Sequence, residues 1–111
     1  MSETTDLPGP VAAFVAAIND ADTEAFVALF SADGIVDDWG TEYRGFDGVR
    51  RWAGSDAIGA GAHMTILSAT TDGDTTRTRF DWRSRIFTGE SAGIFELNGA
   101  LIRRFTIPPS H

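Results

Sequence analysis

The spacing of apolar residues changes along this chain, and this change limits the possible folds more than any other feature of the sequence. In residues 11–30, apolar side chains recur at every third or fourth position, which is the period of one face of an α-helix. From residue 62 onward they alternate with polar side chains, which is the period of a β-strand. Helices followed by a run of strands indicate an α+β domain with a mainly antiparallel sheet.

Three helices are expected before residue 54. The first opens at Pro8-Gly9-Pro10, ends at Asn19-Asp20 and carries the apolar stripe Val11, Phe14, Val15 and Ile18. The second follows Asp22, a residue type that caps helix N-termini. Its inward-facing residues are expected to be Phe26, Leu29 and Phe30. The third follows Asp47 and turns inward Val49, Trp52 and Ala53.

The remaining segments are expected to be turns, loops and strands. Residues 31–34 suggest a turn, 35–39 a short strand, 40–45 a loop and 54–61 a flexible glycine-rich stretch. Further strands are expected at 62–71, 75–87, 92–97 and 100–107. Turns separate them at Asp72-Gly73-Asp74, Thr88-Gly89-Glu90 and Asn98-Gly99. The expected order is α-α-β-α-β-β-β-β, with three helices packed on a curved sheet that leaves a concave apolar mouth.

Composition excludes several classes of function. The 111 residues suffice for one domain, 1–111, with flexible tails expected at 1–7 and 108–111. The chain has neither cysteine nor lysine, which excludes disulfides, thiolate nucleophiles, lysine Schiff bases and Walker-type phosphate loops. Its histidines are His63 and His111, and no acidic loop has calcium-binding spacing, so neither metal nor cofactor is expected.

Charge and hydropathy bear on partners and location. The net charge of −7 argues against nucleic acid and anionic membranes as partners, because phosphate binding requires a basic face. The N-terminus has no signal-peptide pattern, and no apolar run is long enough for a membrane span. A cytoplasmic protein is therefore expected.

The strand expected at 75–87 has two alternating faces. One face carries the charged residues Arg77, Arg79, Asp81, Arg83 and Arg85. The other carries Thr78, Phe80, Trp82 and Ser84. Either the charged face is solvated or faces another subunit, or it places an Arg79–Asp81 pair in a pocket. Side-chain parity makes these alternatives mutually exclusive unless a bulge intervenes.

Three segments, residues 14–19, 27–33 and 43–45, resemble those of the nuclear transport factor 2-like superfamily. This superfamily includes ketosteroid isomerases, limonene-epoxide hydrolases and SnoaL-like polyketide cyclases. The resemblance covers residues 10–107 and implies a cone-like α+β fold. It further implies that a small apolar organic molecule binds in the cone and that two copies pair through the open face of the sheet.

Two enzyme templates of the superfamily match this chain in part. In ketosteroid isomerases a strand aspartate is the base, and Asp38 matches that position. The tyrosine and protonated aspartic acid that hold the enolate there fall on Phe14 and Gly93, which lack a side-chain donor.

The epoxide hydrolases use an Arg-x-Asp on the long strand, which Arg79-Phe80-Asp81 matches. Their water-holding tyrosine and asparagine fall on Val36 and Asp38, and their second carboxylate falls near Thr106. The template is therefore incomplete in this chain.

The SnoaL-like cyclases require only an acid/base carboxylate in an apolar pocket. This template favours Asp38 as a base for metal-free proton transfer in a cyclisation, isomerisation or dehydration. Resemblance to dehydratases adds His63, and the Arg-x-Asp template keeps Arg79 and Asp81 as alternative catalytic residues. The expected ligand-binding residues are Phe14, Val36, Tyr43, Trp52 and Phe95. A ligand-binding or dimerisation module without catalysis remains an alternative, so enzyme activity is left open.

Overall fold

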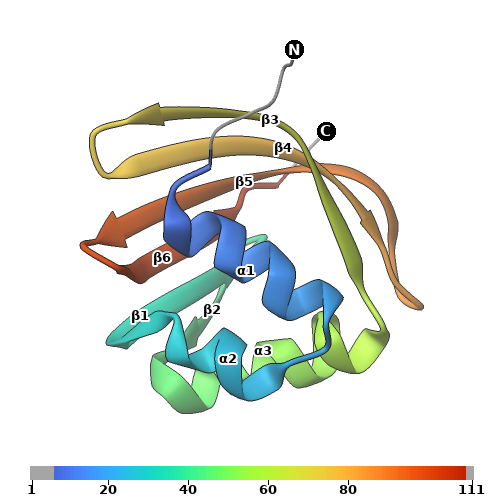
Figure 1. Ribbon diagram of the computed structural model, residues 1–111. Coiled ribbons are helices and arrows are strands. Elements are labelled where there is room, and N and C mark those ends of the chain that lie inside the picture. Colours follow the sequence, from blue (N-terminus) through green and yellow to red (C-terminus); the bar gives the residue numbers. More distant parts are fainter. Residues whose placement is uncertain (1–6, 110–111) are drawn as a thin grey trace.

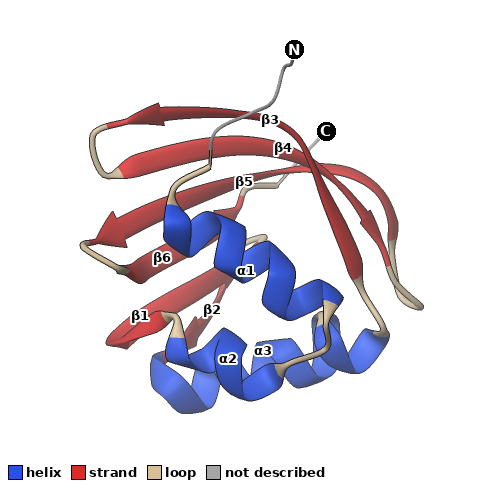
Figure 2. Ribbon diagram, viewed as in Figure 1, coloured by secondary structure: helices blue, strands red, loops and turns tan. Residues whose placement is uncertain are grey.

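The computed structural model of the protein describes residues 7–109. Within this range, helices cover one face of a curved six-stranded sheet, which curls around α1 (Figures 1 and 2). The helices are α1 (Gly9–Asn19), α2 (Thr23–Ala28), α3 (Gly45–Asp56) and the short 3₁₀-helix η1 (Ile58–Ala60). The strands are β1 (Phe30–Asp38), β2 (Thr41–Arg44), β3 (His63–Asp72), β4 (Thr75–Arg83), β5 (Thr88–Asn98) and β6 (Leu101–Ile107).

The strands follow the order β2-β1-β6-β5-β4-β3 across the sheet. β3 to β6 form an antiparallel meander, whereas β1 and β6 are parallel neighbours. This arrangement confirms the predicted α+β cone. The prediction of flexible tails at 1–7 and 108–111 falls mostly on residues outside the described range. Among the described residues, no helix is long and apolar enough to cross a membrane.

The helix ends follow the predicted capping chemistry in part. Pro10 lies in the first turn of α1, where its missing N–H leaves no hydrogen bond unmade. The Asp22 carboxylate accepts a hydrogen bond from the Ala25 backbone N–H at 3.1 Å and caps α2, as predicted. The prediction for α3 was wrong at its start, because the helix begins at Gly45 and Asp47 lies in its first turn.

The largest difference from the predicted elements lies between α2 and α3. The turn predicted at 31–34 belongs to β1, where a bulge between Phe30 and Ile35 absorbs these residues. The loop predicted at 40–45 contains β2, which pairs with β1 through a two-residue turn. Trp39 and Gly40 in this turn both have positive φ, 55° and 92°, as a type I′ hairpin turn requires.

Three further segments differ from the predictions. The predicted strand 75–87 ends at Arg83, and residues 84–87 form a loop. The predicted turn at 88–90 belongs to β5, which begins at Thr88. The stretch predicted as flexible, 54–61, contains the last turn of α3 and all of η1.

The core lies between the helices and the inner face of the sheet. Phe14 is fully buried, and its ring centroid lies 5.0, 4.9 and 4.7 Å from those of Phe26, Phe95 and Phe105. Aromatic pairs at this distance add to the free energy gained by burial of their surface. These ring contacts fix α1 and α2 against the inner face of the sheet.

Candidate functional site

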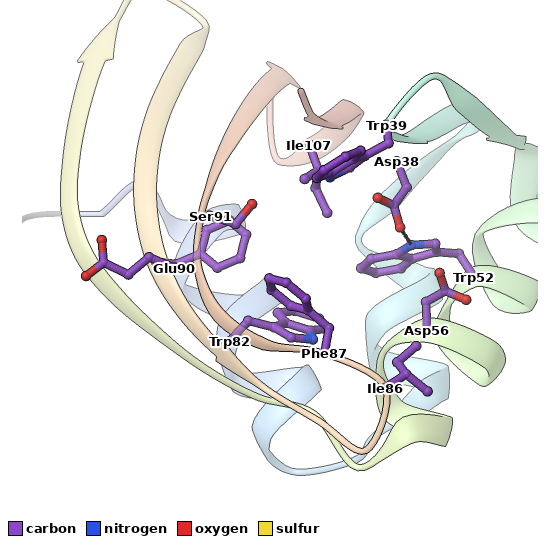
Figure 3. A pocket seen from close by; sticks show the side chains of 11 residues that line it. Asp38, Trp39, Trp52, Asp56, Trp82, Ile86, Phe87, Glu90, Ser91 and Ile107 are labelled. Atoms are coloured by element: carbon purple, nitrogen blue, oxygen red, sulfur yellow. Dashed lines mark hydrogen bonds between the residues drawn. The ribbon is translucent and has the colours of Figure 1, made fainter. Parts of the chain in front are cut away.

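A cavity of about 510 Å³ lies beside the aromatic core, between the end of β1, α3 and the inner face of β4 and β5 (Figure 3). This volume is in the range typical of small-molecule sites. Eleven residues line it: Asp38, Trp39, Trp52, Asp56, Phe80, Trp82, Ile86, Phe87, Glu90, Ser91 and Ile107. Most are apolar or aromatic, and few are polar, as in sites that bind small organic molecules.

Asp38 reaches the cavity because residues of β1 alternate between the two faces of the sheet. Val36 and Asp38 share the inner face, whereas Asp37 points outward to Arg104. The Asp38 carboxylate is half-buried and accepts a hydrogen bond from the Trp52 indole N–H at 3.0 Å. Burial raises the pKa of Asp38, the hydrogen bond from Trp52 lowers it, and the neighbouring Asp56 raises it further.

α3 supplies a second carboxylate to the same cavity. Trp52 and Asp56 are four residues apart and therefore lie on one face of α3. Figure 3 shows the Trp52 ring beside both Asp38 and Asp56. The Ser55 hydroxyl donates a hydrogen bond to Asp56 Oδ1 at 2.6 Å. Two carboxylates from different elements thus line the same cavity.

Aromatic and aliphatic side chains form the opposite wall and the rim. Phe80 and Trp82 point inward from β4 and are 1% and 6% exposed. Trp39, Ile86 and Phe87 come from the loops at the mouth and remain largely exposed. The cavity therefore has a buried aromatic wall and an apolar opening.

The outer face of β4 carries the charged side chains. Arg79 donates a hydrogen bond to Glu90 at 2.8 Å, and Arg83 donates one to Asp81 at 3.1 Å. Figure 3 shows that the Glu90 side chain points away from the cavity. The structure resolves the parity question, because Phe80 and Trp82 face inward. Arg79 and Asp81 therefore do not form a pair in this cavity, which corrects that alternative.

The other expected site residues divide into two groups. His63 is exposed at the start of β3 and lies opposite Arg83 in the strand register, so it is not brought to Asp38. Phe14, Val36 and Phe95 are fully buried in the core and do not line the cavity. Trp52 lines the cavity as expected.

Tyr43 lies next to the cavity but not in its lining. Tyr43 pairs with Val36 in the register of β1 and β2 and packs against the core. Burial raises the pKa of its hydroxyl, and the negative charges of Asp56 and Asp38 raise it further. The hydroxyl is thus within electrostatic reach of both carboxylates.

Several lining residues were not among the expected site residues. Asp56 was missed because 54–61 was expected to be flexible, although its four-residue spacing from Trp52 was a usable signal. Phe80 and Trp82 were identified as one face of a strand but not as a cavity wall. Ile86 and Phe87 were assigned to a strand that ends earlier. Within residues 7–109, no group of three or more potential metal ligands occurs.

Residues 11–106 match the family model of the SnoaL-like domain. Among curated proteins, none matches the chain. The fold is similar to that of a candidate polyketide cyclase from Sinorhizobium meliloti, with 28% identity and a TM-score of 0.84. That alignment covers 92% of this chain and 95% of the other.

Two further structures are similar. One is a Catenulispora acidiphila protein with a ketosteroid isomerase-like fold in complex with trimethylamine, at 25% identity and a TM-score of 0.79, covering 96% of this chain and 88% of that one. Another is a Mycobacterium tuberculosis protein in complex with estradiol-17β-hemisuccinate, at 17% identity and a TM-score of 0.77, covering 91% of each chain. The latter likeness concerns the fold alone. The match over residues 11–106 and the shared fold confirm the resemblance to the nuclear transport factor 2-like superfamily, and the chain belongs to the SnoaL-like domain family.

Proposed function

We propose that the protein binds a small, mostly apolar organic molecule in the cavity and moves a proton on it with Asp38 as the base. The reaction class is a metal-free cyclisation, isomerisation or dehydration. The observation that carries this proposal is the half-buried Asp38 carboxylate, which enters an otherwise mainly apolar cavity and accepts the Trp52 N–H.

The environment of Asp38 suits a general base. A carboxylate in water is a weak base at neutral pH, because its pKa lies far below the pH. Burial raises the pKa of Asp38, which makes its carboxylate more basic. The Trp52 N–H orients the carboxylate without neutralising it. The aromatic walls leave room for a flat, apolar substrate beside it.

Proteins of similar fold support the binding part of the proposal. The Catenulispora acidiphila protein, which is 25% identical, holds a small organic molecule. The Sinorhizobium meliloti protein carries the name of a candidate cyclase, which supports the class of reaction. The cavity described above is large enough for such a molecule.

Deuterium exchange tests the catalytic part. Wild-type protein is incubated in D₂O with a panel of cyclic and aryl ketones, and NMR follows loss of the protons beside the carbonyl. We expect faster exchange for ketones that bind, and a rate lower by about 100-fold or more in Asp38→Asn. Asp33→Asn, an exposed change on the same strand, is the matched control. Binding to the cavity without any acceleration would contradict catalysis.

A binding module without catalysis is the second candidate function. Phe14 and Gly93, which take the places of the two enolate-holding donors, lie in the core, where the rings of Phe105 and Phe80 pack against Gly93. They cannot supply donors to a developing oxyanion. In that case ketones would bind and quench tryptophan fluorescence equally in wild type and Asp38→Asn, with no exchange in either.

Two further expectations stay predictions. Pairing of two copies through the outer face of the sheet predicts a dimer mass in light scattering at micromolar concentration, and a monomer mass would contradict it. Location in the cytoplasm is the other, and microscopy of a fluorescent fusion at native expression would test it.

A further inference from the structure

The charged residues that line the cavity are all acidic. Asp38 lines the cavity from β1, and Asp56 lines it from α3. Asp56 raises the pKa of Asp38, and both carboxylates raise the pKa of the Tyr43 hydroxyl. The third acidic lining residue, Glu90, points away and is paired with Arg79. The charge that faces the cavity is therefore that of two carboxylates.

In the part of the chain that the structure describes, no arginine forms an ion pair with Asp38 or Asp56; the arginine whose charge reaches the neighbouring Tyr43 is Arg51 of α3. Three arginines of β4 and the loop that follows it are engaged elsewhere: Arg79 with Glu90, Arg83 with Asp81, and Arg85 with the Gly59 carbonyl oxygen. Among the described residues, no arginine lines the cavity. Since the chain has no lysine and no arginine lines the cavity, an occupant is the group placed to supply a positive charge beside the two carboxylates.

The aromatic lining favours the same kind of occupant. All three tryptophans of the chain, Trp39, Trp52 and Trp82, line the cavity, together with Phe80 and Phe87. The faces of aromatic rings carry partial negative charge and attract organic cations, and tryptophan does so most strongly. Figure 3 shows Trp39, Trp52 and Trp82 on different sides of the cavity rather than in one stack. A small cation inside would meet rings from several directions.

We propose that the cavity selects a small organic cation, namely a protonated or quaternary amine that carries carbon substituents. The nitrogen charge lies near Asp38 and Asp56, and the substituents contact the tryptophan and phenylalanine rings. This inference rests on the proposed binding of a small molecule in the same cavity and specifies its chemical class. An inorganic cation fits less well, because the aromatic walls do not offer the six or more oxygen ligands that calcium takes.

The test compares two molecules of the same shape. Choline contains a trimethylammonium group, and 3,3-dimethylbutan-1-ol has a neutral carbon in place of the nitrogen. Tryptophan fluorescence reports binding directly, because every tryptophan lines the cavity. We expect choline to bind at least about tenfold more tightly than its neutral isostere. Equal affinity, tighter binding of the neutral molecule, or no binding of either at millimolar concentration overturns the inference.

Variants test whether the carboxylates and the aromatic rings cause the tighter binding of choline. We expect Asp56→Asn to lower choline affinity about tenfold and to leave the neutral isostere unaffected, with Asp33→Asn as the matched control. Trp39→Leu, at an exposed position, should weaken choline binding several-fold, and Trp39→Phe should restore part of it. Unchanged choline affinity in both Asp56→Asn and Trp39→Leu overturns the inference. Ketone exchange that depends on Asp38 would still support the proposed function, so the two failures are distinguishable.

Discussion

Asp37 and Asp38 are neighbours in the chain, yet they lie on opposite faces of β1 in opposite chemical surroundings. Asp37 faces outward, where Arg104 donates a hydrogen bond to it at 2.6 Å and also pairs with Glu42 at 3.0 Å. Asp38 faces the cavity, where its hydrogen bond comes from the neutral Trp52 indole. Several charges on the outer face of the sheet are thus neutralised in pairs, whereas no arginine forms an ion pair with Asp38 among the described residues.

This difference distinguishes the ion pairs of the outer face, which belong to the structure of the surface, from the Asp38 carboxylate, which is a candidate for catalysis. Ion pairs such as Arg79–Glu90 and Arg83–Asp81 are largely exposed and contribute little to stability. A carboxylate that is half-buried without a cation opposes folding, and such groups cluster at functional sites. The contrast between the two faces is therefore the basis for choosing Asp38 over Asp81 as the base.

Adjacent residues of β4 give the largest expected contrast in stability. Phe80→Ala should lower the free energy of unfolding by about 3 kcal/mol, because a buried ring is removed from the inner face. Arg79→Ala, one residue earlier on the outer face, should lower it by less than about 0.5 kcal/mol. Urea denaturation of both variants measures these changes. Similar losses in the two variants would refute the contrast between the faces.

Gly93 tests how closely the inner face is packed. A Cβ atom at Gly93 would lie 2.7 Å from Phe105 Cε1 and 3.0 Å from Phe80 Cε2. We expect Gly93→Ala to destabilise the protein by about 1–3 kcal/mol through overpacking. Gly54→Ala in α3 has open space around its Cβ and should stabilise the protein by about 0.5 kcal/mol instead. Calorimetric melting of both variants checks the signs, and a neutral Gly93→Ala would show a looser core.

The outer carboxylate of β1 should behave as a structural group. Asp37→Asn loses the negative charge that faces Arg104, while its amide oxygen can still accept the Gly40 N–H. At pH 8 we expect a loss of about 1 kcal/mol in the free energy of unfolding, because the pair is mostly buried. Urea denaturation at low and high salt measures this loss in the free energy of unfolding. No loss at either salt concentration would mean that the pair does not stabilise the fold.

Sequence reasoning predicted the fold where period and turn chemistry agreed. The hairpin predicted at Asn98-Gly99 forms with its turn one residue later, at Gly99 and Ala100, and the alternation from Thr76 to Trp82 appears as expected. β2 was missed because its turn places Trp39, rather than asparagine or aspartate, at a positive φ. The composition of residues 31–34 fits a turn and a bulged strand equally well. Composition alone therefore suggested a turn where the structure has a bulge.

The site was predictable only in part. The alternation of β1 indicated correctly that Val36 and Asp38 share a face. Local pattern alone left open which face of β4 points inward, because that depends on how the sheet packs against the helices. The proximity of Asp56 to Asp38 depends on the packing of α3 against β1, which spacing along the chain does not encode.

Thermal melting of Asp38→Asn at pH 4 and pH 8, beside wild type and Asp37→Asn, measures whether the Asp38 carboxylate opposes folding. Burial raises the pKa of folded Asp38 above its unfolded value, so its charge opposes folding once the pH exceeds that unfolded value. This penalty is absent at lower pH, grows as the pH rises, and is complete above the folded pKa. Asparagine removes the charge and can still accept the Trp52 N–H.

We therefore expect Asp38→Asn to melt as high as wild type at pH 8, or up to about 4 °C higher, with a smaller difference at pH 4. Asp37→Asn should melt below wild type at pH 8, which shows that the assay detects the loss of a stabilising carboxylate. A clearly lower melting temperature of Asp38→Asn at pH 8 would contradict the account, because Asp38 would then be a structural carboxylate rather than a base held in the cavity.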